Sequence, residues 1–219
     1  MDDPIRLAIL KDKIAQGEDD PTRHPLLRTP AEQRIRDEAD WLFRERGIRN
    51  VTIEHIARRS GTNAPFVLEY FGSLEDLVVE YLKRRVAEQR RADERFWLRV
   101  QKEYPKDQKQ QLRAWICAMA PGSRDPFIPI PLTMQAIDFL YDMQHPGRAI
   151  VVQYKADLRD YLARLCCDAF FRQPEVLAEK LLMLAEGAFV QRTIFGGEQP
   201  AERLIEAAED LFKRHWESA

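Results

Sequence analysis

The sequence predicts an all-α protein in which a small three-helix head at the N-terminus precedes a larger helical bundle. Apolar residues recur about every 3.6 residues, the period of an α-helix, through nearly every segment of the 219-residue chain. The alternating pattern of half-buried strands and the Asn-Gly or Asp-Gly pairs of tight hairpins are absent from the sequence. Because 45% of the residues are hydrophobic, the chain can bury a sizeable core.

The first helix of the head begins after Thr29. Thr29 is an N-cap residue, Pro30 suits the first helical position, Glu32 completes a capping box, and Gly47 marks the end of the helix. Its apolar stripe predicts a core-facing side made of Ile35, Ala39, Leu42 and Phe43. The preceding residues are polar and interrupted by glycine and proline, which predicts a flexible arm over residues 1–27.

Two short helices come next. One begins after the N-cap residue Thr52 and ends at Gly61, and the other begins after the N-cap residue Asn63 and ends at Gly72. Two short helices joined by a glycine turn are typical of a helix-turn-helix. We therefore expect a helix-turn-helix domain over residues 28–72.

A long helix then begins after Ser73 and runs toward Tyr104, which would link the head to a body over residues 73–219. Prolines divide the rest of the body. The helical period predicts further helices near residues 107–119, 132–144, 148–172, 175–195 and 201–216.

The composition argues against several classes of protein. No apolar run approaches the roughly 20 residues that span a bilayer, and the acidic start of the chain is unlike a signal peptide. We therefore expect a cytoplasmic protein with no membrane partner. The three cysteines, Cys117, Cys166 and Cys167, lack the spacing of a metal site, so we expect reduced thiols, no metal and no cofactor.

Catalysis is not expected either. The four histidines are scattered, and no Gly-x-Ser-x-Gly, phosphate-loop or dinucleotide fingerprint occurs. The net charge of −2 argues against a protein that coats nucleic acid indiscriminately, because such binding rests on summed phosphate neutralisation. Residues 23–63, however, carry nine arginines against six acids, so the head is mildly basic.

A set of residues at characteristic positions lies between Arg34 and Leu77. Its members are Leu42, Phe43, Gly47, Thr52, Ile56, Ala57, Gly61, Tyr70, Phe71, Ser73 and Asp76. This set resembles the N-terminal signature of the TetR family of transcriptional regulators. The C-terminal part agrees with that family in length, helix count and the pair Gly187-Ala188 in the penultimate helix.

The resemblance implies a transcriptional regulator, which we expect to be a repressor, with a ligand-binding and dimerisation body. Two recognition helices, one from each copy of a homodimer, would enter successive major grooves of a pseudo-palindromic, double-stranded DNA operator. A small apolar or amphipathic effector in the body would favour a different separation of these helices and so release the DNA.

On this interpretation, side chains of the head divide between phosphate contact and base reading. The predicted DNA-binding residues are Arg28, Arg34, Thr52, Arg58, Thr62, Asn63, Phe66, Glu69 and Tyr70. Phe66 would touch thymine methyl groups, Asn63 would read adenine if it were not used in capping, and Glu69 would accept from a cytosine amino group.

The recognition helix also departs from the family pattern. Ala64 and Leu68 stand where members commonly carry a lysine and a tyrosine, and Glu69 is the only charged residue between Thr62 and Phe71. An acid repels phosphate. The alternative hypothesis is therefore a TetR-fold protein without an operator, which would bind a lipid, another small molecule or a protein.

Large, soft side chains are frequent in the body and favour an apolar effector pocket between helices, although ordinary core packing is the alternative for each of them. The predicted pocket residues are Trp115, Met119, Phe127, Met134, Asp138, Phe139, Tyr154, Phe170 and Met183.

The last two helices carry apolar stripes that would either be buried within one chain or form half of a two-fold, four-helix interface. Small residues in the first of these helices favour close approach, so we expect an interface. Its predicted residues are Leu181, Leu184, Ala185, Ala188, Phe189, Arg192, Leu204, Ala208, Leu211 and Phe212.

Overall fold

The computed structural model describes residues 29–120 and 143–216, and its regular elements within these ranges are all helical. In chain order they are α2 (Pro30–Arg46), the short 3-10 helix η3 (Ile48–Asn50), α3 (Ile53–Ser60), α4 (Ala64–Phe71), α5 (Leu74–Glu103), α6 (Gln108–Met119), α8 (Pro146–Asp168), α9 (Pro174–Phe195) and α10 (Gln199–Arg214). The all-α fold predicted from the sequence is confirmed. The predicted arm and most of the predicted helix at 132–144 lie outside the described residues.

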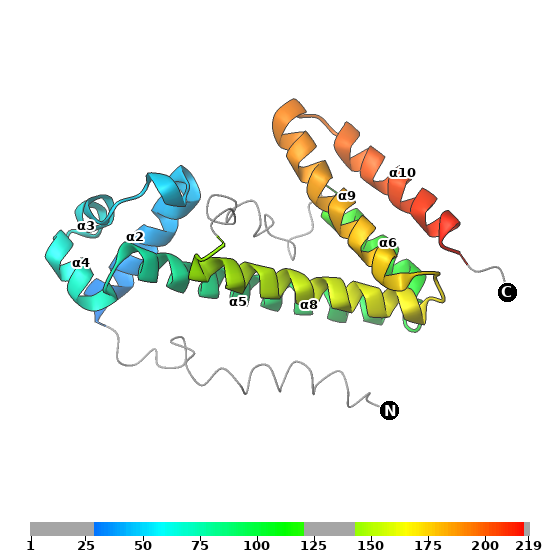
Figure 1. Ribbon diagram of the computed structural model, residues 1–219, viewed down its shortest axis with the longest axis horizontal. Helices are drawn as coiled ribbons and strands as arrows, with labels where there is room; N and C mark the ends of the chain where they lie inside the picture. The colour runs from blue at the N-terminus through cyan, green and yellow to red at the C-terminus, as the bar shows by residue number, and fades with distance from the viewer. Residues whose placement is uncertain (1–28, 121–142, 217–219) are drawn as a thin grey trace.

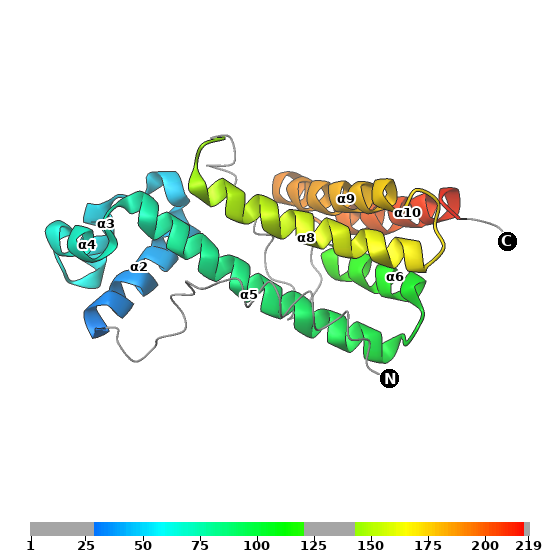
Figure 2. The ribbon, with the colours of Figure 1, turned by 60° about the horizontal axis from the view of Figure 1, so that its bottom comes forward.

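The head and the body lie at opposite ends of the molecule (Figure 1). Helices α2, α3 and α4 form the head, whereas α6, α9 and α10 gather at the other end. Helices α5 and α8 run side by side between the two ends, as Figure 2 shows from another direction. No described helix combines the length and the apolar character that crossing a bilayer requires.

Side-chain caps determine where the helices of the head begin. The Thr29 hydroxyl accepts from the backbone N–H of Glu32 at 3.3 Å, and the Glu32 carboxylate accepts from the backbone N–H of Thr29 at 3.1 Å. Ser73 caps α5 in the predicted way. Helix α8 begins at Pro146, two residues earlier than predicted, because the imidazole of His145 caps the backbone N–H of Gly147.

Two apolar cores hold the molecule together. The head core contains the predicted stripe of α2 together with Ile56, Val67 and the first turns of α5. Two residues of the body helix α8, Val151 and Tyr154, also belong to it. The body core contains Phe96 and further residues of α5, α6, α8, α9 and α10. Helices α5 and α8 therefore contribute to both cores.

Two buried ion pairs join α2 to α5. The guanidinium of Arg36 lies 2.5 Å from Glu80, and that of Arg84 lies 2.6 Å from Asp40. The sequence pattern of arginines and acids along α5 predicts a solvent face with pairs inside the helix, and this interpretation is wrong for Arg84, which is largely buried and bonds to α2. Sequence spacing within one helix does not show which charges a neighbouring helix will meet.

Burial of Asp40 raises its pKa from 3.8 to about 6, because the loss of solvation outweighs the attraction of Arg84 and Arg44. A carboxyl whose pKa is raised by folding contributes stability that is present below the unfolded pKa and is lost as the pH rises through the folded pKa. The ion pair with Arg84 therefore fixes the position of α2 without adding to stability at neutral pH.

We expect Asp40→Asn to gain stability relative to the wild type as the pH rises from about 4 to about 7, by up to about 3 kcal/mol for a shift of this size. Urea unfolding at several pH values measures the difference. Asp210→Asn is the matched control, because the Asp210–Lys213 pair is exposed and its loss should change little at any pH. A difference between Asp40→Asn and the wild type that is independent of pH would contradict this account.

Candidate nucleic-acid interface

Hydrogen bonds fix the turn between α3 and α4. Gly61 lies in the left-handed region with φ 68°, where a side chain would be strained, and the N–H of Thr62 donates to the carbonyl of Ala57 at 2.9 Å. The hydroxyl of Ser60 lies 2.9 Å from the carbonyl of Ile56 and 2.8 Å from the hydroxyl of Thr62. The angle at which α4 leaves α3 is therefore well defined.

Helix α4 is anchored by one face and open on the other. Val67 and Phe71 are buried in the head core, and the guanidinium of Arg36 lies 4.8 Å from the centre of the Phe71 ring. On the opposite side, Leu68 and Tyr70 are 43% and 46% exposed, and Glu69 is exposed as well. The head thus presents a short helix whose outer side chains have no role in its core.

Two of the predicted base-reading residues have structural roles in the head. The Asn63 side-chain oxygen accepts from the backbone N–H of Phe66 at 2.9 Å, so only its amide NH₂ can still donate. Thr62 is half-buried and bonded to Ser60. Phe66 is half-buried against the core, with its ring centre 4.7 Å from that of Tyr70.

The outer face of α4 is therefore formed mainly by Leu68, Glu69 and Tyr70. Leu68 is absent from the predicted DNA-binding residues. Helical phase does not identify it, because residues three positions apart share a side of a helix and Leu68 stands three positions before the buried Phe71.

The cations of the head fall into two groups. Arg34 and Arg58 are exposed and have no partner among the described residues, as predicted contacts to phosphate require. Arg59 is fixed in place, because its guanidinium lies 2.5 Å from Glu38 and 3.7 Å from the centre of the Trp41 ring. The predicted phosphate contact Arg28 lies outside the described residues.

The Thr52 hydroxyl caps the N-terminus of α3. It accepts from the backbone N–H of His55 at 3.4 Å, and its hydrogen bond to Glu54 lowers the pKa of that carboxyl. His55 is half-buried, and its Nδ1 accepts from the backbone N–H of Thr52 at 3.3 Å. His55 takes the part in this capping box that Glu usually plays.

The members of the predicted effector pocket that the structure describes do not converge on one site. Trp115 and Met119 belong to the body core, Tyr154 belongs to the head core, and Phe170 and Met183 are 79% and 72% exposed. Four more predicted members, Phe127, Met134, Asp138 and Phe139, lie outside the described residues. Phe170 follows the end of α8 with φ 60°, which the helical pattern of the sequence does not reveal.

The predicted dimer-interface residues lie largely inside the chain's own body. Leu181, Ala185, Ala188, Leu204, Ala208 and Phe212 are all buried, whereas Leu184, Phe189, Arg192 and Leu211 are half-buried. The buried six are covered by neighbouring helices of the same chain, so their assignment to a surface for a partner is corrected. The apolar stripes that contain these six residues are therefore buried within one chain, which is the first of the two alternatives predicted for the last two helices.

A different face of α9 carries apolar side chains that are exposed to solvent. Met183, Val190 and Ile194 are 72%, 43% and 63% exposed, and a Cβ added to Gly187 would meet nothing within 4 Å. These four residues, the α9 stripe, follow one another at helical spacing along one side of the helix. Such contiguous exposed apolar surface marks contact sites.

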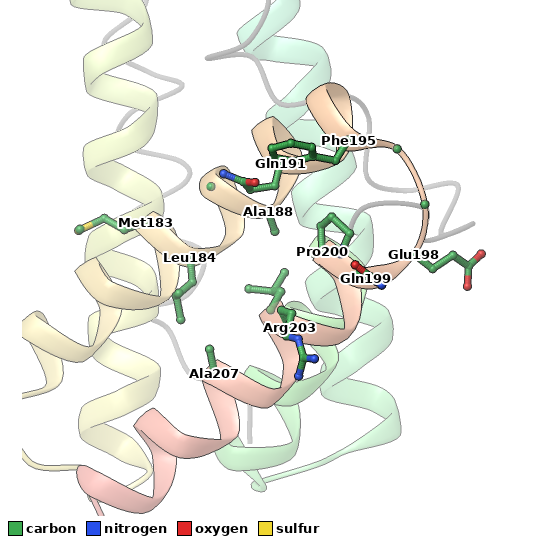
Figure 3. Close-up of a pocket in the computed structure, with 14 residues that line it drawn as sticks. Met183, Leu184, Ala188, Gln191, Phe195, Glu198, Gln199, Pro200, Arg203 and Ala207 are labelled. Carbon is green, nitrogen blue, oxygen red and sulfur yellow. The ribbon is translucent and has the colours of Figure 1, made fainter.

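A groove of about 860 Å³ lies beside this stripe, between the end of α9 and the start of α10 (Figure 3). Leu184 and Ala188 of α9 point toward Ala207 of α10 across its floor, and Phe195 lies at its upper end. Arg203, Gln191 and Glu198 supply polar groups along the rim. Among the described residues, no cluster of three or more histidine, cysteine, aspartate or glutamate side chains could hold a metal ion.

Comparisons with known proteins agree with the helix-turn-helix geometry of the head. A sequence family described as bacterial regulatory proteins, tetR family, matches residues 35–81, which span the helix-turn-helix and the start of α5. A search of curated proteins returns no match.

Several solved structures share the fold. A TetR-family transcriptional regulator from Streptomyces coelicolor is 22% identical with a TM-score of 0.69, covering 91% of this chain and 97% of that protein. A protein from Saccharomonospora viridis, described as a transcriptional regulator and solved in complex with choline, is 19% identical with a TM-score of 0.63 over 83% and 94% of the two chains. The reduced form of NemR from Escherichia coli is 16% identical with a TM-score of 0.62, covering 84% and 98%.

The signature of residues 35–81 lies on the helix-turn-helix itself, and the likeness to the solved regulators extends through the body. Residues 35–81 thus match the tetR family of bacterial regulatory proteins, and the chain as a whole has the fold of solved TetR-family regulators.

Proposed function

We propose that this protein is a ligand-controlled repressor that binds a pseudo-palindromic DNA operator as a homodimer. The proposal rests mainly on the exposure of α4. Val67 and Phe71 anchor this helix in the head core, and its opposite face is exposed to solvent. A helix of this kind fits the major groove of DNA. An operator-binding protein works where the DNA is, so a cytoplasmic location is part of the proposal.

The outer face of α4 suits a mainly apolar contact with bases. Leu68 and Tyr70 would lie against thymine methyl groups, and the Glu69 carboxylate would accept from a cytosine amino group. Since α4 carries no cation, the phosphates must be contacted from its neighbours. Arg34 and Arg58 are exposed for this task.

The α9 stripe supports the homodimer. A second copy related by a two-fold axis would bring the same stripe against the first one, cover the exposed apolar side chains and fill the groove beside α10. The small Gly187 at its centre permits close approach of the two helices. Two heads would then be held at a fixed separation, as a pseudo-palindrome requires.

For the effector, we propose a small apolar or amphipathic molecule bound in the body. The complex with choline of the Saccharomonospora viridis protein, which has the same fold, supports a small organic molecule as the ligand. Such a molecule can release DNA only by binding more tightly to the conformation in which the heads are wrongly spaced.

A second candidate is a TetR-fold binding protein with no operator, and the exposed Glu69 on a cation-free α4 favours it. Selection from a random duplex library at about physiological salt separates the two candidates, because sequence-independent attraction is weak there. Enrichment of a pseudo-palindrome supports the repressor. No enrichment by a folded dimer supports the second candidate.

We expect Arg34→Ala and Arg58→Ala each to weaken binding to the selected operator and to random DNA alike, and to reduce the slope of log affinity against log salt by about one. Fluorescence anisotropy at several salt concentrations measures both effects. Arg91→Ala is the matched control, because Arg91 is an exposed cation on α5. Unchanged slopes in both head variants would place the phosphate contacts elsewhere.

We expect Ile194→Glu to convert the dimer to a monomer, because it places two charges in an apolar contact without partners. Sedimentation velocity measures the assembly state, and circular dichroism checks that the helices remain. Leu98→Glu is the control, since Leu98 is 62% exposed on α5 and lies outside the α9 stripe. A dimer that persists in Ile194→Glu would exclude this face as the interface.

A further inference from the structure

A polar layer separates the two apolar cores along α5 and α8. On α5, the last residue of the head core is Val86 and the first of the body core is Phe96. On α8, Tyr154 ends the head core and Leu162 is the first buried residue of the body core. The polar side chains of Gln89 and Asp93 lie in the interval on α5.

One half-buried carboxylate, which lies between the buried side chains of Gln89 and Tyr154, organises this layer. Asp93 accepts from the Tyr154 hydroxyl at 2.8 Å with one oxygen and from the Gln89 amide at 2.9 Å with the other. Burial raises the pKa of Asp93, and it also raises that of Tyr154 well above its usual value. At the edge of the layer, Arg90 of α5 lies 2.5 Å from Asp157 of α8.

A buried polar network of this kind adds little to stability compared with apolar packing of the same volume, but it permits one arrangement of its helices. Apolar cores on either side would tolerate small sliding and rotation of α8 against α5. The directional hydrogen bond between Tyr154 and Asp93 would not tolerate such sliding or rotation. Close packing holds the two helices together nearer the head, because a Cβ at Gly147 of α8 would lie 2.4 Å from the Leu82 side chain of α5.

We infer that the hydrogen bond from Tyr154 to Asp93 is the contact that sets the angle of the head relative to the body. Tyr154 lies in the head core but is carried by a body helix, so its bond to Asp93 fixes α8 against the helix that carries the head. In a dimer, the same angle sets the separation of the two α4 helices. Only this last consequence rests on the function proposed above.

Distances between spin labels test the inference without DNA. One label is placed on the head at Glu45→Cys, and the other on the native Cys167 at the end of α8, which is exposed. Cys117→Ser removes the other exposed thiol, and Cys166 is buried. Dilution with unlabelled protein restricts the measurement by pulsed electron resonance to distances within one chain.

We expect a single narrow distance in the wild type and a broader or shifted distribution in Tyr154→Phe, which keeps the ring and loses only the hydroxyl. Tyr161→Phe is the matched control, because the Tyr161 hydroxyl accepts from Gln101 of α5 at 3.0 Å within the body. Tyr161→Phe should lower the thermal stability about as much as Tyr154→Phe does, and it should leave the distance between the labels unchanged. Asp93→Asn keeps an acceptor for Tyr154 and should retain a narrower distribution than Asp93→Leu.

A distribution in Tyr154→Phe that matches the wild type overturns the inference, and so does equal broadening in Tyr161→Phe. On a selected operator, Tyr154→Phe should lose about fivefold of the preference for the native half-site spacing over spacings changed by one base pair, the factor that one hydrogen bond commonly represents. If the wild type selects no operator, the proposed function fails, whereas the spin-label result still decides the positioning role.

Discussion

The structure depends on the burial of one long helix, α5, in two cores. Its 30 residues span about 45 Å, and its first turns are buried with the head while Phe96, Trp97 and Val100 are buried with the body. Helices α2, α4, α6 and α9 pack directly on it or on α8, which runs beside it in the same direction, and α3 and α10 pack on those helices. A displacement at either end of this pair is therefore carried to the other end by rigid, hydrogen-bonded backbone, and the side chains at the middle decide how freely the pair can adjust.

The recognition helix shows how little of a short helix is needed for stability. Eight residues would not remain helical alone, so α4 depends on its N-cap residue Asn63, on the Gly61 turn and on the buried Val67 and Phe71. Its three outermost side chains are then free to carry sequence preference. Because that face is apolar and acidic, any affinity for DNA must divide between base contacts on α4 and charges on the helices around it.

Much of this fold could be predicted from the sequence, because helix ends are local. Thr29, Thr52, Asn63 and Ser73 cap the helices they were expected to cap. The candidate sites were harder to predict, since a stripe shows that a face is buried and not what covers it. Leu181 and Leu204 are covered within the chain, and Asp40 and Arg84 meet across two helices that are remote in sequence.

Helix α9 is apolar on two sides. Leu181 and Ala185 face the core of the chain, and the α9 stripe faces outward. Two narrow polar edges separate these faces, one with Glu179, Glu186 and Thr193 at intervals of two helical turns and the other with Lys180 and Gln191. Neutral evolutionary drift in this helix has few positions to use, so among relatives α9 should change slowly around most of its circumference and accumulate its differences along these edges.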